Sequence, residues 1–133
     1  MSGPKPNTSL RTPLGRVRGH GAARSGTHHF ITQRASAAAL VILIPWFVIS
    51  AALFLGRGYD SDFGWIANPL NAIGLILLVL AAFYHMRLGL QVVIEDYISK
   101  PLTKTLLLLV NTFVAYGAAV AAIFAILRIS FGS

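Results

Sequence analysis

Three long apolar stretches limit what this chain can fold into more than any other feature of its sequence. Residues 35–55 carry no charge, and residues 69–95 and 105–127 are apolar apart from a few polar positions. A helix of about 20 residues crosses the roughly 30 Å hydrocarbon core of a bilayer, so each stretch is long enough to span a membrane. The sequence therefore predicts an all-α integral membrane protein with three transmembrane helices.

The composition agrees with this fold class and excludes others. Hydrophobic residues make up 56% of the chain and charged residues 11%, whereas roughly 25% of the residues of a soluble domain are charged. A soluble globular enzyme and a disordered chain are therefore excluded. Cysteine is absent, which excludes disulfides, thiolate ligation of an iron–sulfur cluster, a Cys-based zinc site and covalent c-type haem attachment in this chain.

The segments outside the spans differ in composition. Residues 1–24 are rich in Arg, Pro and Gly and contain no acid, so we expect a basic, flexible arm before a membrane domain of residues 25–133. A nucleic-acid-binding arm is the less favoured alternative, and we expect no nucleic-acid partner. Residues 56–68 and 98–104 predict two polar loops, the second interrupted by Pro101.

The distribution of charge predicts the orientation in the membrane. The first 34 residues hold six basic side chains, and the second loop adds Lys100 and Lys104, whereas the first loop sets Arg57 against Asp60 and Asp62. Positively charged flanks stay in the cytoplasm. In a bacterial inner membrane, the amino terminus would then be cytoplasmic and the carboxyl terminus periplasmic.

His85 and Arg87 lie deep in the second predicted span, and His85 is the single histidine within the predicted spans. Ionisable groups at membrane depth are costly and often functional, and a neutral imidazole is a common axial ligand of haem iron. Gly89 lies on the same helical face as His85 and would leave room for a flat macrocycle. The alternative is a histidine that hydrogen-bonds a neighbouring helix. Arg87 should either meet an anion, such as a carboxylate or a haem propionate, or extend toward the membrane surface.

Asp96 and Tyr97 end the second span. Asp96 follows His85 by eleven residues, which is about 16 Å along a helix and within about 20° of the same face. A phenol and a carboxylate would thus lie at the membrane rim, in line with the histidine. An ordinary helix end with a solvated acid and an interfacial aromatic residue is the alternative.

The third span contains two features typical of helix packing. Gly117, Ala121 and Ala125 recur every four residues, and a stripe of small residues lets helix backbones approach closely. We expect Asn111 to form an interhelical hydrogen bond.

Two segments resemble a known family. The run from His85 to Tyr97 fits the pattern His-x(3)-Gly-x(6)-Asp-Tyr, and residues 26–37 are similar to the segment before the first span of the same family. That family is the small hydrophobic membrane anchor subunits of succinate dehydrogenase. The order of parts also agrees, with a basic arm, three spans and the motif at the end of the second span.

The resemblance implies a place in respiratory complex II, within the tricarboxylic acid cycle and the respiratory chain. In that complex a flavoprotein oxidises succinate, an iron–sulfur protein carries the electrons onward, and two membrane anchors hold haem b and reduce ubiquinone. This chain would then pack with the other anchor, the cytochrome b subunit, into a helical bundle in membrane lipid. It would contribute to the quinone site and to haem ligation but perform no succinate chemistry itself.

The resemblance also implies roles for individual residues. His85 would be one axial haem ligand, with the second from the cytochrome b subunit, and Gly89 would allow close haem packing. Tyr97 would hydrogen-bond a carbonyl oxygen of ubiquinone, and Asp96 would hold Tyr97 or help to deliver protons. His28 and Arg34 match positions near the haem propionates, and Arg87 is a further candidate for a propionate contact.

Two other functions stay open at this point. A fumarate reductase anchor would share these features, because the sequence does not determine the direction of electron flow. A small structural or transport membrane protein without a cofactor would use His85 and Arg87 as a buried polar pair or as part of a proton path.

Overall fold

The described part of the chain folds into helices only. The computed structural model describes Leu14 and residues 24–132, within which there are four helices and no strand. Three of them are long and apolar enough to cross a membrane, which confirms the predicted all-α fold with three spans. The predicted basic arm, residues 1–24, lies almost wholly outside the described residues. The helices are α2 (Arg24–Phe54), α3 (Tyr59–Ala67), α4 (Pro69–Tyr97) and α5 (Pro101–Ser130).

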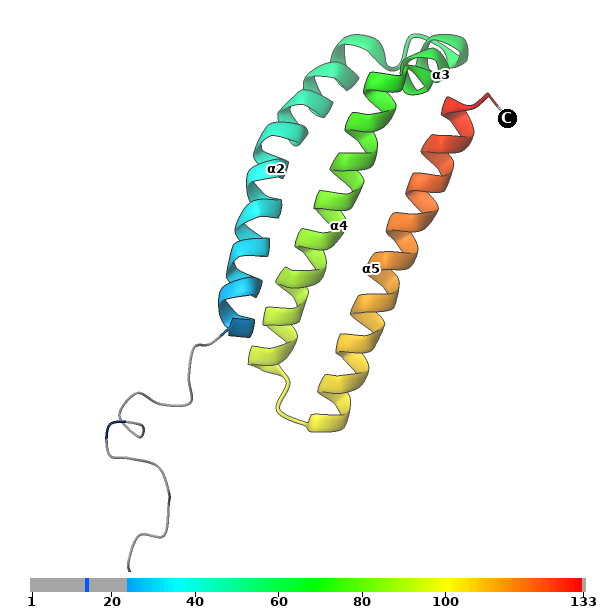
Figure 1. Cartoon of the computed structure of the whole chain (residues 1–133). Helices are drawn as coiled ribbons and strands as arrows, with labels where there is room; N and C mark the ends of the chain where they lie inside the picture. Colours follow the sequence, from blue (N-terminus) through cyan, green and yellow to red (C-terminus); the bar gives the residue numbers. More distant parts are fainter. Residues whose placement is uncertain (1–13, 15–23, 133) are drawn as a thin grey trace, which may run out of the picture.

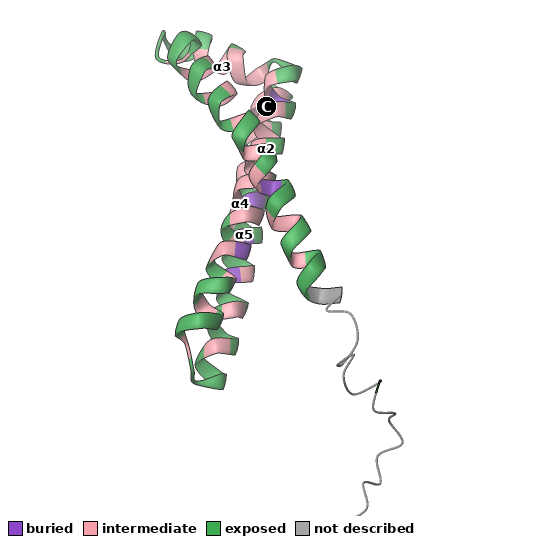
Figure 2. Ribbon diagram, turned by 90° about the vertical axis from the view of Figure 1, so that its left-hand side faces the viewer, coloured by how far each residue is buried: buried purple, intermediate pink, exposed green. Residues whose placement is uncertain are grey.

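Helix α4 is the centre of the arrangement. The three long helices lie side by side in the order α2, α4, α5 (Figure 1), and α4 packs against both neighbours, whereas the described residues of α2 and α5 do not pack against each other. The start of α2 and the α4–α5 turn lie at one end of the molecule, and α3 and the end of α5 lie at the other. Seen from the side, the first half of α2 diverges from α4 and α5 (Figure 2).

The first helix begins eleven residues before the predicted span. Residues 24–34 are polar, but they contain no proline, and the Thr32 hydroxyl donates to the carbonyl of His28 within the helix. The helix therefore extends from the apolar span toward the aqueous phase. Consequently His28 and His29 lie in the first turns of a candidate membrane span. Both histidines precede the predicted span at residues 35–55, within which there is no histidine.

Both predicted loops are shorter than expected. Within residues 56–68 the structure forms α3, because Asp60 and Asp62 in its first turn complement the helix dipole and Trp65 stacks on Trp46, with ring centroids 6.2 Å apart. The second loop is reduced to residues 98–100, because Pro101 begins α5. Proline suits the first turn of a helix, where its missing N–H would have no partner.

The contact between α4 and α5 uses a different stripe from the predicted one. Asn111, Ala115 and Ala119 are buried against α4, and the Asn111 side chain donates to the carbonyl of Arg87 at 2.9 Å. The predicted interhelical hydrogen bond is thus confirmed. The stripe of Gly117, Ala121 and Ala125 is exposed instead. Both stripes have a spacing of four residues, so the spacing alone did not identify the contact face.

The described helices bury little of their apolar surface. The buried hydrophobic residues are few and mostly small, and many large apolar residues are exposed. Exposed positions occur along all three long helices (Figure 2). A surface of this kind suits contact with lipid or with another membrane helix rather than with water. The buried hydrophobic residues are Ala72, Leu88, Ala115 and Ala119.

The contact between α2 and α4 depends on Gly74. A Cβ atom at this position would lie 2.5 Å from the ring of Trp46. We therefore predict that Gly74→Ala destabilises the full-length chain in detergent micelles by about 1–3 kcal/mol, the usual cost of overpacking. Thermal unfolding followed by the helical circular dichroism signal measures this change. Gly117→Ala is the matched control, since a Cβ there meets nothing within 4 Å. Equal Tm values for the two variants would contradict the prediction.

Candidate functional site

His85 faces α2, where it contacts Ser36. The His85 Nδ1 atom lies 3.1 Å from the Ser36 hydroxyl, and the same hydroxyl donates to the carbonyl of Gln33 at 2.9 Å. A serine hydroxyl has one proton, so when that proton goes to Gln33, Nδ1 carries the proton of the His85–Ser36 bond. The Nε2 atom then keeps its lone pair. Within the described part of the chain nothing hydrogen-bonds Nε2, so it is available to a ligand.

His85 also lines a hollow on the surface. The hollow has a volume of about 390 Å³ and lies between the first half of α2 and α4, where the two helices diverge. The guanidinium of Arg34 stacks over the ring of Phe30, 5.1 Å from its centroid. A cation, an aromatic face and an imidazole nitrogen therefore meet at one open site. Its lining residues are Phe30, Gln33, Arg34, Ala37 and His85.

Gly89 is one helical turn beyond His85 on α4. A Cβ atom at Gly89 would meet nothing within 4 Å. The packing of this chain therefore does not require glycine at position 89, in contrast to Gly74. Open space beside Gly89 is what a flat ligand held by His85 would need.

The other two histidines of α2 differ in exposure. His28 is exposed and does not line the hollow. His29 is partly buried, and its Nε2 atom is buried without a hydrogen-bond partner in the described structure. His29 and Ser36 are seven residues apart and so lie on one face of α2. The sequence does not show which of these two adjacent histidines is buried. That depends on the rotation of α2 about its axis, which the sequence leaves open.

The carboxyl end of α4 presents Asp96 and Tyr97 to the surroundings. Both side chains are exposed, Tyr97 to 83%, and the structure describes no hydrogen bond between them. The neighbouring Glu95 accepts from Gln91 at 2.8 Å, and Lys104 donates to the Glu95 carbonyl at 3.0 Å. This lysine caps the last turn of α4 and fixes the α4–α5 turn. Because α4 is continuous from Pro69, His85 and Asp96 share a face about 16 Å apart.

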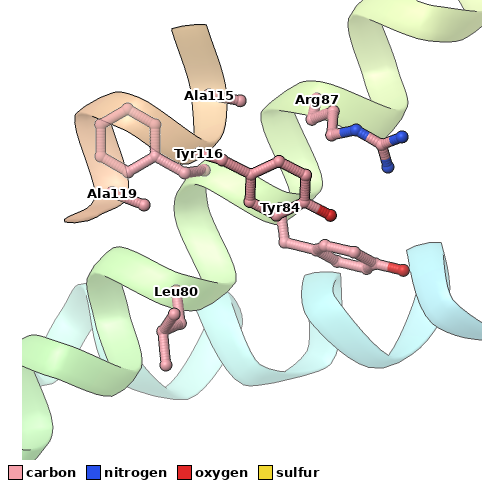
Figure 3. Close-up of a pocket in the computed structure, with 7 residues that line it drawn as sticks. Leu80, Tyr84, Arg87, Ala115, Tyr116 and Ala119 are labelled. Atoms are coloured by element: carbon pink, nitrogen blue, oxygen red, sulfur yellow. The ribbon is translucent and has the colours of Figure 1, made fainter. Parts of the chain in front are cut away.

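Arg87 lies on the opposite side of α4 from His85, against α5. Its Nε donates to the Thr112 hydroxyl at 3.3 Å, and its guanidinium lies 5.4 Å from the ring centroid of Tyr116. It lines a separate pocket of about 170 Å³ between α4 and α5 (Figure 3). Of the three candidates for propionate contacts, Arg34 alone lines the hollow of His85. The role of each of the three stays a prediction.

Sequence reasoning did not identify Ser36. Its hydroxyl lies in a run of small residues at the start of an apolar stretch, and serine there is common in helix packing. The pairing of positions 36 and 85 follows from the antiparallel register of α2 and α4. That register depends on contacts such as Trp46 on Gly74.

The site offers few ligands for a bare metal ion. The described residues contain no group of three or more His, Asp or Glu side chains placed to hold a metal. His85 presents a single imidazole to the hollow. A metal bound there would need most of its ligands from another molecule, as an iron in a macrocycle has.

Comparisons with known proteins all point to the same family. Residues 8–125 match the profile of a family described as the succinate dehydrogenase/fumarate reductase transmembrane subunit. The chain is 34% identical to a succinate dehydrogenase hydrophobic membrane anchor subunit of Rickettsia bellii, over 78% of this chain and 84% of that protein. It is 27% identical to the protein of the same name from Paracoccus denitrificans, over 92% and 94%. No solved structure shows significant similarity to the chain.

Proposed function

The chain belongs to the succinate dehydrogenase/fumarate reductase transmembrane subunit family, and on this premise we propose that it helps to hold haem b and to form the ubiquinone-reduction site of a succinate dehydrogenase. It is a membrane anchor subunit of that complex. The names of the relatives favour succinate dehydrogenase over fumarate reductase. Association with the other subunits of the complex follows from this role, and the proposed partners are the flavoprotein, the iron–sulfur protein and the cytochrome b subunit.

The single observation that carries the haem proposal is the environment of His85. Its Nδ1 lies 3.1 Å from the Ser36 hydroxyl, and Nε2 has no hydrogen-bond partner among the described residues, so Nε2 is the nitrogen that would ligate iron. A hydrogen bond to the second nitrogen is how proteins fix the tautomer and the ring orientation of a ligating histidine. Haem b would supply one-electron redox chemistry there. Arg34 lines the same hollow and would neutralise a propionate, and the open space at Gly89 would accept the edge of the macrocycle.

The position of Tyr97 supports the quinone proposal. The phenol is exposed at the last residue of α4, at the end where an extramembrane partner could reach it. When ubiquinone is reduced, negative charge develops on its carbonyl oxygens, and a phenol donor at one oxygen stabilises that charge. Asp96 is the adjacent exposed carboxylate and would help to relay protons from the aqueous phase.

The first prediction for this function concerns His85. In the complex purified from membranes, His85→Ala should remove the b-type haem band from the reduced-minus-oxidised optical spectrum, because the axial ligand is lost. Ser36→Ala should keep the imidazole but weaken haem retention by about 10–100-fold, the usual effect of removing the partner of a ligating histidine.

Met86→Ala is the matched control for this spectrum, since Met86 is an exposed neighbour outside the hollow. A His85→Ala complex that assembles and retains an unchanged haem spectrum would remove His85 as the ligand. An unchanged haem affinity in Ser36→Ala would contradict the proposed role of the Ser36 hydrogen bond.

The second prediction concerns Tyr97. Tyr97→Phe should lower the rate of succinate-dependent ubiquinone reduction by about 10²-fold or more, as expected on loss of one donor to a developing negative charge. Succinate oxidation with an artificial acceptor that takes electrons from the soluble subunits should be unchanged, because those electrons do not pass through the quinone site. Phenylalanine keeps the ring, so the fold at the end of α4 should also be kept. Equal losses with both acceptors would contradict a quinone site at this rim.

The third prediction concerns orientation. The start of α2 and the α4–α5 turn lie at the same end of the molecule, and this end carries Lys100 and Lys104. Positive charge favours the cytoplasmic side, so a periplasm-active reporter fused after Ser133 should be active in a bacterial host. A reporter active only in the cytoplasm would overturn the orientation.

A further inference from the structure

Arg87 places a positive charge in the membrane for which this chain supplies no anion. Arg87 is ten residues before the end of α4, about 15 Å along its axis and about 6 Å from its midpoint. An arginine at such depth is costly unless it is paired. The chain has four acids. Two of them, Asp60 and Asp62, lie in α3 at the far end, and Glu95 and Asp96 are exposed near the end of α4.

Most of the hydrogen-bonding capacity of Arg87 is free. Its Nε is bonded to Thr112, whose proton goes to the Leu108 carbonyl. The guanidinium has four further N–H groups. None of them has a hydrogen-bond partner within the described residues. These donors match the planar, two-oxygen face of a phosphate or a carboxylate.

The pocket beside Arg87 has a polar end and an apolar end. The hydroxyls of Tyr84 and Tyr116 and the guanidinium of Arg87 point to the same side in Figure 3, away from Leu80 and Ala119. The apolar end is formed by Leu80, Phe83 and Ala119. Along α4 the polar end is nearer the membrane surface at Tyr97 and the apolar end is nearer the midplane. This is the layout of a phospholipid with its head toward that surface.

We propose that the pocket between α4 and α5 binds an anionic phospholipid, with its phosphate on Arg87, Tyr84 and Tyr116 and an acyl chain beside Leu80 and Phe83. Arginine reaches lipid phosphates from this depth by extension toward the surface and by local thinning of the bilayer. This site is separate from the proposed haem site, because His85 faces α2 and Arg87 faces α5.

The shape of the pocket favours a lipid over the carboxylate of a partner helix. The pocket is small, with a volume of about 170 Å³, and it opens to the surface at Leu80 and Tyr116, which are both about half exposed. An acyl chain fits a slot of this kind, whereas an acidic residue on a helix would bring a second backbone against the exposed ring of Tyr116.

The test is lipid retention by the intact complex in native mass spectrometry, with dioleoylphosphatidylglycerol as the probe. The wild-type complex should retain the lipid, and Arg87→Gln should weaken its binding by roughly tenfold or more, since charge-assisted hydrogen bonds are lost. Tyr116→Phe should weaken it less, because the ring under the guanidinium stays. Arg57→Gln, at the opposite membrane surface, is the matched control and should bind normally.

Two competitor molecules distinguish a bound phospholipid from a bound free phosphate compound. Dioleoylglycerol lacks the phosphate, and glycerol 3-phosphate lacks the acyl chains, so neither should displace the probe. Displacement by glycerol 3-phosphate would show a site for a free phosphate and overturn the lipid proposal. Equal retention of the probe by wild type, Arg87→Gln and Tyr116→Phe would also overturn the lipid proposal. If the Arg87→Gln complex does not assemble, equal retention by wild type and Tyr116→Phe overturns it.

A photocrosslink identifies the occupant directly. With Leu80 replaced by p-benzoylphenylalanine, illumination of the complex in its native membrane should add the mass of a phospholipid to this chain. A crosslink that joins this chain to another subunit instead would show that a partner helix fills the pocket and would overturn the proposal. Neither readout depends on the haem spectrum or on quinone reduction, so failure here leaves the proposed function standing.

Discussion

A helix in hydrocarbon satisfies its own backbone hydrogen bonds, and each polar side chain that it carries needs a partner on a neighbouring helix or in a ligand. Helix α4 meets this requirement in two directions within one turn. His85 reaches Ser36 on α2, whereas Arg87 reaches Thr112 on α5 and accepts from Asn111 through its carbonyl. Side chains two positions apart on a helix point about 200° away from each other, so these positions bond the two flanking helices and set the order α2, α4, α5.

The resulting arrangement is incomplete by itself. With α4 between its two neighbours, each helix leaves much of its apolar surface exposed, and the buried residues along the contacts are mainly small. Small residues allow close backbone approach, but they leave no large core that would hold the three helices rigidly. The divergence of the first half of α2 also opens the hollow at His85. A cofactor shared with a second anchor subunit would fill that hollow, and the same subunit would cover the adjoining apolar surface.

The spans and the motif at the end of α4 could be predicted from the sequence because hydrophobic length and residue spacing determine them. The start of α2 could not, because residues 24–34 are polar yet compatible with a helix that extends beyond the hydrocarbon core. The choice between Asn111, Ala115 and Ala119 and the exposed stripe at Gly117 depended on the rotation of α5 about its axis. The Ser36 contact depended on the register of α2 against α4, which the large Trp46 ring over Gly74 helps to set.

The two polar residues in the middle of α4 also divide the molecule by chemistry. On the α2 side, the His85 imidazole and the cation Arg34 both line an open hollow, which suits a large acidic cofactor. On the α5 side, a fixed cation and two phenols converge on a small apolar slot, which suits an anionic amphiphile. Because His85 and Arg87 point about 200° apart, one helix turn presents the imidazole to α2 and the guanidinium to α5, where it stacks on Tyr116, and so bonds both flanking helices.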